Sequence, residues 1–175
     1  MDSLEFLIYT LKKIGMMILL ILFATLVVLD IAPSFATFFV ESSPIYKYLT
    51  SVAGASFTGW LVMLIFLARL FYDDGKRHTA YEIWNSANIT IVFILMLVVY
   101  FVPTVFKDSL HAEGKGKAFY ELFYAPVAWL EVLFGMKLTS AAAVGLGIML
   151  VILFAVYVIA YKLYVRKHKS LQKKG

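Results

Sequence analysis

Three residues of metal-ligating type, Asp108, His111 and Glu113, lie close together in one polar stretch of the chain. Carboxylate and imidazole groups bind divalent metal ions when three or four of them converge on one point. The spacing of these three residues matches no metal motif of defined geometry, and glycines at 114 and 116 are typical of a loop. We therefore expect a solvated loop, with a metal site as the alternative.

A second group of polar residues lies where a hydrophobic segment begins: Glu82, Asn85, Ser86 and Asn88 share one face of a predicted helix. Polar side chains at membrane depth face a neighbouring helix or a water-filled cavity. We expect this face to pack in a helix bundle, and the alternative is that it lines a substrate or ion path. Glu82 is also a candidate ion-pair partner of Arg69, unless Arg69 extends to lipid phosphates and Glu82 caps its own helix.

The segment Glu82-Ile-Trp-Asn85-Ser86-Ala87 resembles the Glu-x-x-Asn-Thr-Ala segment of small bacterial lipid kinases. That resemblance implies a lipid-modifying enzyme at a membrane face. The family continues with a further glutamate and a charged cytoplasmic stretch, whereas Asn88, Ile89 and an unbroken apolar run follow here. We therefore do not assign the chain to this family, and a lipid-modifying enzyme is the weakest of the functions that we consider.

The sequence contains no phosphate-binding loop, zinc-protease motif or nucleophile elbow. Gly145-Leu-Gly147 lies inside an apolar run rather than after a strand, so it is not a nucleotide fingerprint. No apolar run carries a charge in its central part, although proton relays and most membrane enzymes need ionisable groups there. We therefore predict no catalytic residue, no cofactor and no metal, in a protein that is not an enzyme.

Composition places the chain in a lipid bilayer. Of its 175 residues, 62% are hydrophobic and 15% are charged, with no cysteine, whereas soluble domains carry about 25% charged residues. A spanning helix needs about 20 apolar residues, and charged residues divide this chain into four apolar runs. Three are long enough, and the first, of 16 residues, is short unless Lys13 extends to the interface and Asp30 lies among the headgroups. We predict an all-α polytopic membrane protein, with one membrane domain over residues 1–175 and an uncleaved first span rather than a signal peptide. The predicted spans are 14–31, 46–71, 83–106 and 138–161.

Capping and turn signals predict where the helices begin and end. A loop is expected from Asp30 to Ser43, and Ser43-Pro44 is typical of a helix start. The dipeptide Asp74-Gly75, preceded by a second aspartate, indicates a turn between the second and third spans. Thr79, three residues before Glu82, forms a capping box that would begin the third helix. Pro103 would interrupt that helix.

The distribution of basic residues indicates the orientation. Eleven of the 16 Lys and Arg residues fall on the side that holds both termini, and basic residues favour the cytoplasm. We therefore expect both termini in the cytoplasm, in a membrane that we take to be the bacterial plasma membrane. The basic tail 162–175 is attracted to anionic lipids, and the net charge of +5 does not indicate nucleic-acid binding.

Residues 118–134 precede the last span and combine a wide aromatic face with a narrow polar strip. The strip consists of Glu121, Ala125, Ala128 and Glu131. This pattern predicts an amphipathic helix in the outer membrane interface, bent or restarted at Pro126, with Trp129 at headgroup depth. A re-entrant segment is the alternative.

Small residues recur every four positions on two of the predicted spans, a spacing that lets helix backbones approach closely. On the second span these are Ser51, Ala55 and Gly59, and on the fourth they are Ala141 with Gly145 and Ala143 with Gly147. We expect the two helices to run parallel and to cross closely in the outer leaflet. Contacts between subunits are the competing use of either set.

Four helices with short connections and no chemistry of their own favour an interaction role. Our first functional hypothesis is a non-enzymatic subunit or accessory factor of a larger membrane assembly, such as a secretion, conjugation or transport machine. Its partners would be other membrane proteins. The second hypothesis is a homo-oligomeric channel or small transporter lined by the polar face of the third span.

Overall fold

The computed structural model describes residues 3–80, 86–106 and 115–172, and all regular structure in these ranges is helical. Three long apolar stretches, Leu4–Ala36, Val52–Thr79 and Leu138–Val165, have the length and composition to cross a membrane. A shorter apolar helix covers Ile89–Val105. The prediction of an all-α protein with membrane-length apolar helices is therefore confirmed.

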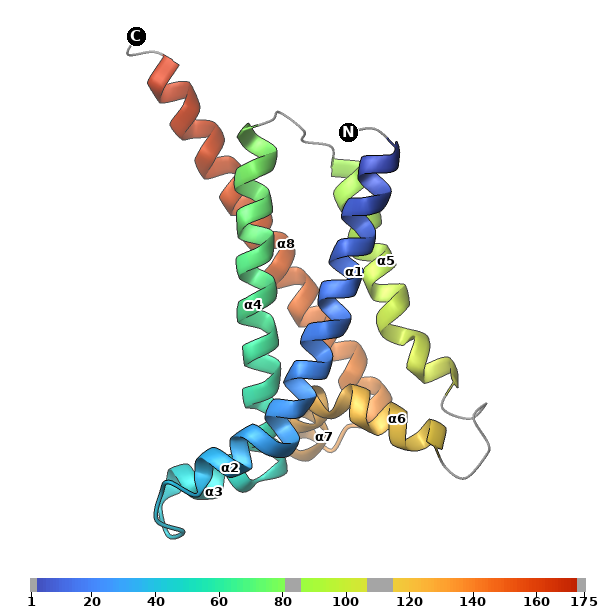
Figure 1. Cartoon of the computed structure of the whole chain (residues 1–175), viewed down its shortest axis with the longest axis vertical. Coiled ribbons are helices and arrows are strands. Elements are labelled where there is room, and N and C mark those ends of the chain that lie inside the picture. The colour runs from blue at the N-terminus through green and yellow to red at the C-terminus, as the bar shows by residue number, and fades with distance from the viewer. Residues whose placement is uncertain (1–2, 81–85, 107–114, 173–175) are drawn as a thin grey trace.

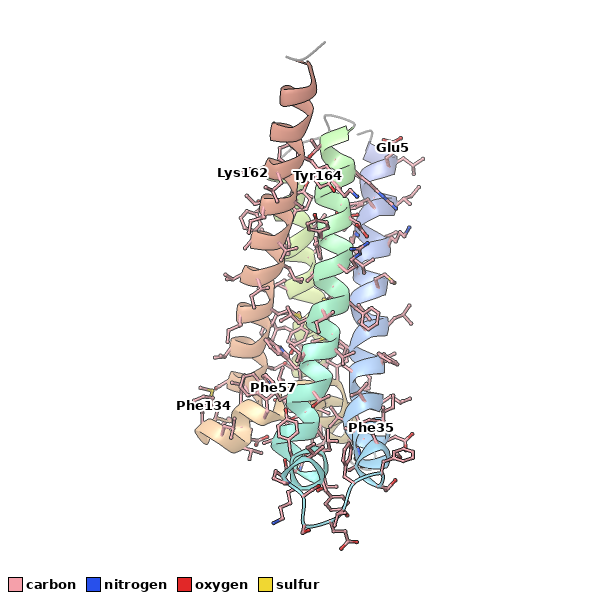
Figure 2. The ribbon with its side chains drawn as sticks, turned by 90° about the vertical axis from the view of Figure 1, so that its left-hand side faces the viewer. Glu5, Phe35, Phe57, Phe134, Lys162 and Tyr164 are labelled. Atoms are coloured by element: carbon pink, nitrogen blue, oxygen red, sulfur yellow. The ribbon has the colours of Figure 1, made fainter. Side chains whose placement is uncertain are left out.

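Figure 1 shows the long helices α1 (Ser3–Leu26), α4 (Val52–Ala80) and α8 (Leu138–Gln172) extending between the two ends of the molecule, with α1 and α8 crossing in this view. α5 (Ser86–Phe106) begins beside α1 and diverges from it toward the other end. We call the end where α1 begins and α4 and α8 finish the terminal end. The opposite end carries short helices that cross the bundle, and we call it the platform end. In Figure 2, Glu5, Lys162 and Tyr164 lie toward the terminal end, and Phe35 and Phe134 lie at opposite edges of the platform end.

The core is apolar and draws side chains from all four long helices. α4 packs most extensively on α8 and also contacts α1. Each of α1, α4, α5 and α8 contributes a buried methionine, whose flexible side chain fills irregular spaces in a core. Fully buried members include Met17 and Ile21 of α1, Met63 and Leu67 of α4, Met96 of α5, and Met149 and Leu153 of α8.

The first long helix extends further than expected. After α1 the chain continues through a π-helix, Val27–Ile31, into α2 (Ala32–Ala36), so the predicted loop from Asp30 is wrong up to Ala36. A π-helix widens the hydrogen-bond ladder, and the wider turn precedes Pro33, whose missing N–H then falls in the first turn of α2. The extension carries Phe35 beyond the bundle (Figure 2).

The second predicted span is two helices rather than one. Ser43 caps α3 (Pro44–Thr50) by accepting a hydrogen bond from the Tyr46 N–H at 3.2 Å, which confirms the predicted start. Ser51 then takes an extended conformation and caps α4 by accepting from the Gly54 N–H at 3.0 Å. Only glycine fits at position 54, because a Cβ there would collide with the Tyr48 carbonyl. α3 therefore belongs to the platform.

The predicted turn at residues 73–75 and the predicted helix start at Thr79 are both wrong, because α4 continues to Ala80. The local turn signal is overridden by tertiary contacts. Asp74 has its ion-pair and hydrogen-bond partners on α1, and Gly75 lies directly against the α8 backbone at Tyr157. The Thr79 hydroxyl donates to the Gly75 carbonyl at 2.9 Å instead of capping a new helix.

Two further boundaries differ from expectation. α5 contains Pro103 and continues to Phe106, so the predicted interruption at Pro103 is wrong. The proline lacks one backbone donor, and the helix ends within one turn after it. α8 runs to Gln172, so most of the basic tail 162–175 extends the last helix.

The predicted interfacial segment is helical and interrupted at the predicted proline. α6 (Lys115–Tyr124) is followed by a 3-10 turn, Ala125–Val127, and by α7 (Ala128–Phe134). Gly135 ends α7 with a left-handed φ of 63°, which glycine adopts without strain. In Figure 1 these helices lie across the platform end of the bundle rather than along it.

Candidate functional site

A buried ion pair joins α1 to α4 at the terminal end. The Lys13 ammonium pairs with the Asp74 carboxylate, and their side chains are only 8% and 11% exposed. The Tyr9 hydroxyl donates a hydrogen bond to the same Asp74 oxygen at 2.9 Å. The Lys13 ammonium also lies over the Tyr9 and Phe71 rings, 5.2 and 5.4 Å from their centroids. Asp74 is therefore bound by two groups of α1.

His78 extends this group toward α8. It lies one turn beyond Asp74 on α4, and its Nδ1 is 2.7 Å from the Tyr157 hydroxyl of α8. Its ring also packs against Tyr9, with centroids 5.4 Å apart. We call Tyr9, Lys13, Asp74, His78 and Tyr157 the terminal cluster. Together these side chains connect three helices.

Helix geometry and one glycine explain how the cluster forms. Tyr9 and Lys13 are four residues apart on α1, and Asp74 and His78 are four apart on α4, so each pair shares one helix face. A Cβ on Gly75 would lie 2.7 Å from the Tyr157 carbonyl oxygen and 2.9 Å from the Ala160 Cβ. The absence of that atom allows α4 and α8 to approach closely at this level.

The terminal cluster is a polar link that holds helices together, and we call this role a clasp. Its two charges neutralise one another, and the phenol and imidazole groups that surround them are hydrogen bonded. Buried polar networks whose members are all satisfied rigidify a fold. A charge pair inside a membrane bundle also resists separation, because either partner alone would be buried without compensation. The cluster therefore fixes α1, α4 and α8 relative to one another.

The sequence-predicted polar face lies mostly beyond what the structure describes. Glu82 and Asn85 fall outside the described residues, and only the backbone of α5 is described at Ser86 and Asn88. Arg69 forms an exposed ion pair with Asp73 one turn along its own helix, at 3.2 Å. The candidate metal ligands Asp108, His111 and Glu113 also lie outside the described residues.

The predicted small-residue positions pack, but largely against other elements. A Cβ on Gly59 would lie 2.7 Å from the Ala24 carbonyl oxygen, so this glycine of α4 meets α1. A Cβ on Gly145 would lie 2.6 Å from the Val127 Cγ1, so this glycine of α8 meets the 3-10 turn. The Gly145 carbonyl accepts a hydrogen bond from the Trp60 indole at 3.3 Å, which is a contact between α4 and α8.

α4 and α8 run parallel, as predicted, but their closest glycine-mediated approach is at Gly75 rather than at the predicted positions. Ala55 and Ala141 are buried, whereas Ala143 is exposed and a Cβ on Gly147 would meet nothing within 4 Å. Ser51 serves as a helix cap. The spacing therefore identified two glycines at close contacts, although the nearest atoms to Gly59 belong to α1 and the π-helix and those to Gly145 belong to the 3-10 turn and α7.

The platform end contains an open pocket of about 470 Å³, a volume within the range of ligand sites. We call it the platform pocket. One wall is the whole polar strip that the sequence indicated, Glu121, Ala125, Ala128 and Glu131. The opposite wall comes from the π-helix with Pro33 and from the junction of α3 and α4 around Val52. The pocket therefore combines apolar walls with two carboxylates.

Buried hydrogen bonds attach the platform to the long helices. The Tyr124 hydroxyl of α6 donates to the Tyr100 carbonyl of α5 at 2.6 Å, and burial raises the pKa of Tyr124. The Tyr120 hydroxyl lies 2.8 Å from that of Thr139 on α8. The Thr25 hydroxyl of α1 donates to the Leu122 carbonyl at 2.9 Å. The wall that carries Glu121 is therefore held by three different helices.

Trp129 contributes to the same attachment from α7. Its ring meets Phe57 and Trp60 of α4 edge-on, with centroids 5.2 and 5.7 Å apart. Its buried indole N–H has no acceptor among the described residues. The prediction that Trp129 lies at headgroup depth stays a prediction, whereas its packing against α4 is a feature that the sequence did not indicate.

Searches against protein-family models, curated proteins and solved structures find no match for this chain.

Proposed function

We propose that this protein is a non-enzymatic subunit or accessory factor of a larger membrane assembly, and that it docks a partner protein on its platform end. The platform pocket is the observation that carries this proposal. It is open, its volume suits a ligand or a few side chains, and its walls are held to the long helices by buried contacts. A preformed concave surface of this kind lowers the entropy cost of binding.

The character of the core favours this role over transport. Large apolar side chains fill the space between the long helices, and the buried charges of the terminal cluster are paired with one another. A substrate or ion path needs polar groups that face a water-filled space. In the part of the chain that the structure describes, the open polar feature at the platform end suits docking better than conduction.

The proposed arrangement in the membrane has four spans. α5 would be the fourth, because its apolar part, Ile89–Val105, connects the terminal end with the platform end. Both termini would then be cytoplasmic, as the basic residues favour, and the platform would lie at the outer surface of a bacterial plasma membrane. The basic end of α8 would contact anionic lipids of the inner leaflet.

Sizing of the native protein after extraction in mild detergent tests the proposed function. We expect a heteromeric complex that contains a second protein in constant ratio. Ala128→Phe, which places a ring in the platform pocket, should reduce the recovered complex about tenfold, because a docked side chain would lose its site.

The matched control is Ala143→Phe, since Ala143 is exposed on α8 and lies outside the pocket lining. It should leave the complex intact. Recovery of only monomers or homo-oligomers from native membranes would contradict the proposal, as would equal effects of the two phenylalanine variants.

A further inference from the structure

The two carboxylates of the platform pocket lie at the ends of its polar strip. Glu121 belongs to α6 and Glu131 to α7, and both side chains are exposed. The 3-10 turn Ala125–Val127 separates the two helices, so the carboxylates line the pocket from two different helices. Between them Ala125 and Ala128 present only methyl groups, which permit a close approach by another backbone.

Neither carboxylate is neutralised strongly by the chain itself. Lys117 lies 3.7 Å from Glu121 on the same helix, and both side chains are more than half exposed, so the pair is weak and screened by salt. Glu131 has no ion-pair partner among the residues that the structure describes. The pocket therefore offers negative charge to an incoming group.

The rest of the lining carries no charge and is mostly apolar. It includes the π-helix residues Val28 and Leu29, Pro33, and Val52 and Ala55 where α4 begins, with the hydroxyls of Thr50 and Ser51 at the junction of α3 and α4. π-helices are rare and occur frequently at functional sites. Here the widened turn and the break at Ser51 place two helix ends around the hollow, and they leave an apolar surface facing the polar strip.

We infer that the platform pocket binds an amphipathic helical segment of a partner protein, in which small or apolar residues lie between two basic side chains. The inference rests on the proposed function. The basic groups pair with Glu121 and Glu131, and the apolar side chains fill the wall at Leu29 and Val52. Charge complementarity of this kind selects the partner and its orientation.

Two other occupants fit less well. The basic end of α8 lies at the terminal end, as Lys162 in Figure 2 shows, so it is remote from the pocket of its own molecule. The phosphate of a lipid headgroup would be repelled by both carboxylates. A basic segment reaching the platform from another protein meets neither difficulty.

A protection experiment on the purified full chain tests the inference. Because the chain has no cysteine, Val52→Cys in the pocket and Val40→Cys outside the pocket lining form a matched pair of alkylation sites. Each variant is reconstituted in phosphatidylcholine vesicles, and its reaction with a membrane-impermeant maleimide is timed. The probes are two synthetic Ala/Leu helical peptides, identical except that one carries two arginines on either side of its apolar residues and the other carries two glutamates at the same positions.

The arginine peptide should protect Val52→Cys at a concentration about tenfold lower than the glutamate peptide, while Val40→Cys reacts at an unchanged rate with both. The preference should disappear when Glu121→Gln and Glu131→Gln are combined. Equal protection by the two peptides, or a preference that survives both glutamine substitutions, would overturn the inference.

A lipid occupant gives a separate result. The comparison is between phosphatidylglycerol and phosphatidylcholine vesicles, both without peptide. If phosphatidylglycerol slows the alkylation of Val52→Cys but not of Val40→Cys, the pocket binds a lipid and the inference is overturned. Failure of the proposed function is distinguishable, because it appears in the sizing of native complexes with Ala128→Phe. If the native complex depends on Ala128 but not on the two glutamates, the proposed function is retained and only the inference of a basic partner segment is overturned.

Discussion

Charged residues occur in contrasting settings at the two ends of this molecule. At the terminal end, Lys13 and Asp74 are buried and bonded to each other, and neighbouring aromatic side chains surround them. At the platform end, Glu121 and Glu131 are exposed along an open pocket. Burial with full pairing makes the first group a clasp that holds helices together. Exposure beside a cavity makes the second group available to a partner.

The largest expected effect separates two adjacent aspartates. Asp74→Asn removes the partner of a buried lysine and should lower the free energy of unfolding by about 3 kcal/mol. Asp73→Asn breaks only an exposed pair with Arg69 and should cost less than about 1 kcal/mol. Unfolding in mixed micelles, titrated with dodecyl sulfate and followed by tryptophan fluorescence, measures both. Equal losses would show that the terminal cluster is not a clasp.

The combination of Lys13→Met with Asp74→Leu sharpens this test. Replacement of both charges by apolar side chains should be less damaging than Asp74→Leu alone, because no uncompensated charge is then buried. Strictly additive losses in the same titration would mean that the two residues do not interact.

An intermediate effect is expected at the glycine beside the clasp. Gly75→Ala places a methyl group against the α8 backbone and should cost about 1–3 kcal/mol. Gly15→Ala, on α1, meets nothing within 4 Å and should be neutral or stabilise by up to about 1 kcal/mol. The difference is measured in the same micelle titration. If Gly75→Ala leaves the free energy of unfolding unchanged, α4 and α8 do not approach closely at this position.

The smallest expected effect on stability lies at the platform pocket. Glu121→Gln combined with Glu131→Gln should change the free energy of unfolding by less than about 0.5 kcal/mol, because both side chains are exposed. If the loss of unfolding free energy is comparable to that of Asp74→Asn in the micelle titration, the pocket carboxylates support the fold. The distinction between structural charges at the terminal end and partner-binding charges at the platform end would then be wrong.

Apolar runs between charged residues predicted the long helices, because the thickness of a bilayer sets the length that a spanning helix needs. The Ser43 cap and the interruption near Pro126 followed from local chemistry and are also present. Boundaries at residues 73–80 could not be predicted in this way. Their local signals indicate a turn, and only the contacts of Asp74 with α1 and of Gly75 with α8 favour a continuous helix.

The candidate sites differ in how far the sequence revealed them. The strip from Glu121 to Glu131 was visible as a helix face, and it lines the platform pocket. The opposite wall depends on a π-helix and on the break at Ser51, which no local pattern announced. The terminal cluster joins residues 65 positions apart, Tyr9 and Asp74. The sequence shows that Tyr9 and Lys13 are four residues apart and share a helix face, but it does not show which helix packs against that face.

Photo-crosslinking in native membranes tests the central claim most directly. A benzophenone amino acid is placed at Val52 in the platform pocket and, as the matched control, at Val151, which is exposed on α8. The proposed function predicts one defined protein adduct from position 52 and only lipid adducts from position 151. The basic segment inferred for the partner predicts in addition that the adduct is lost when Glu121 and Glu131 are both changed to lysine. Lipid adducts alone from both positions would contradict the docking of a partner at the platform.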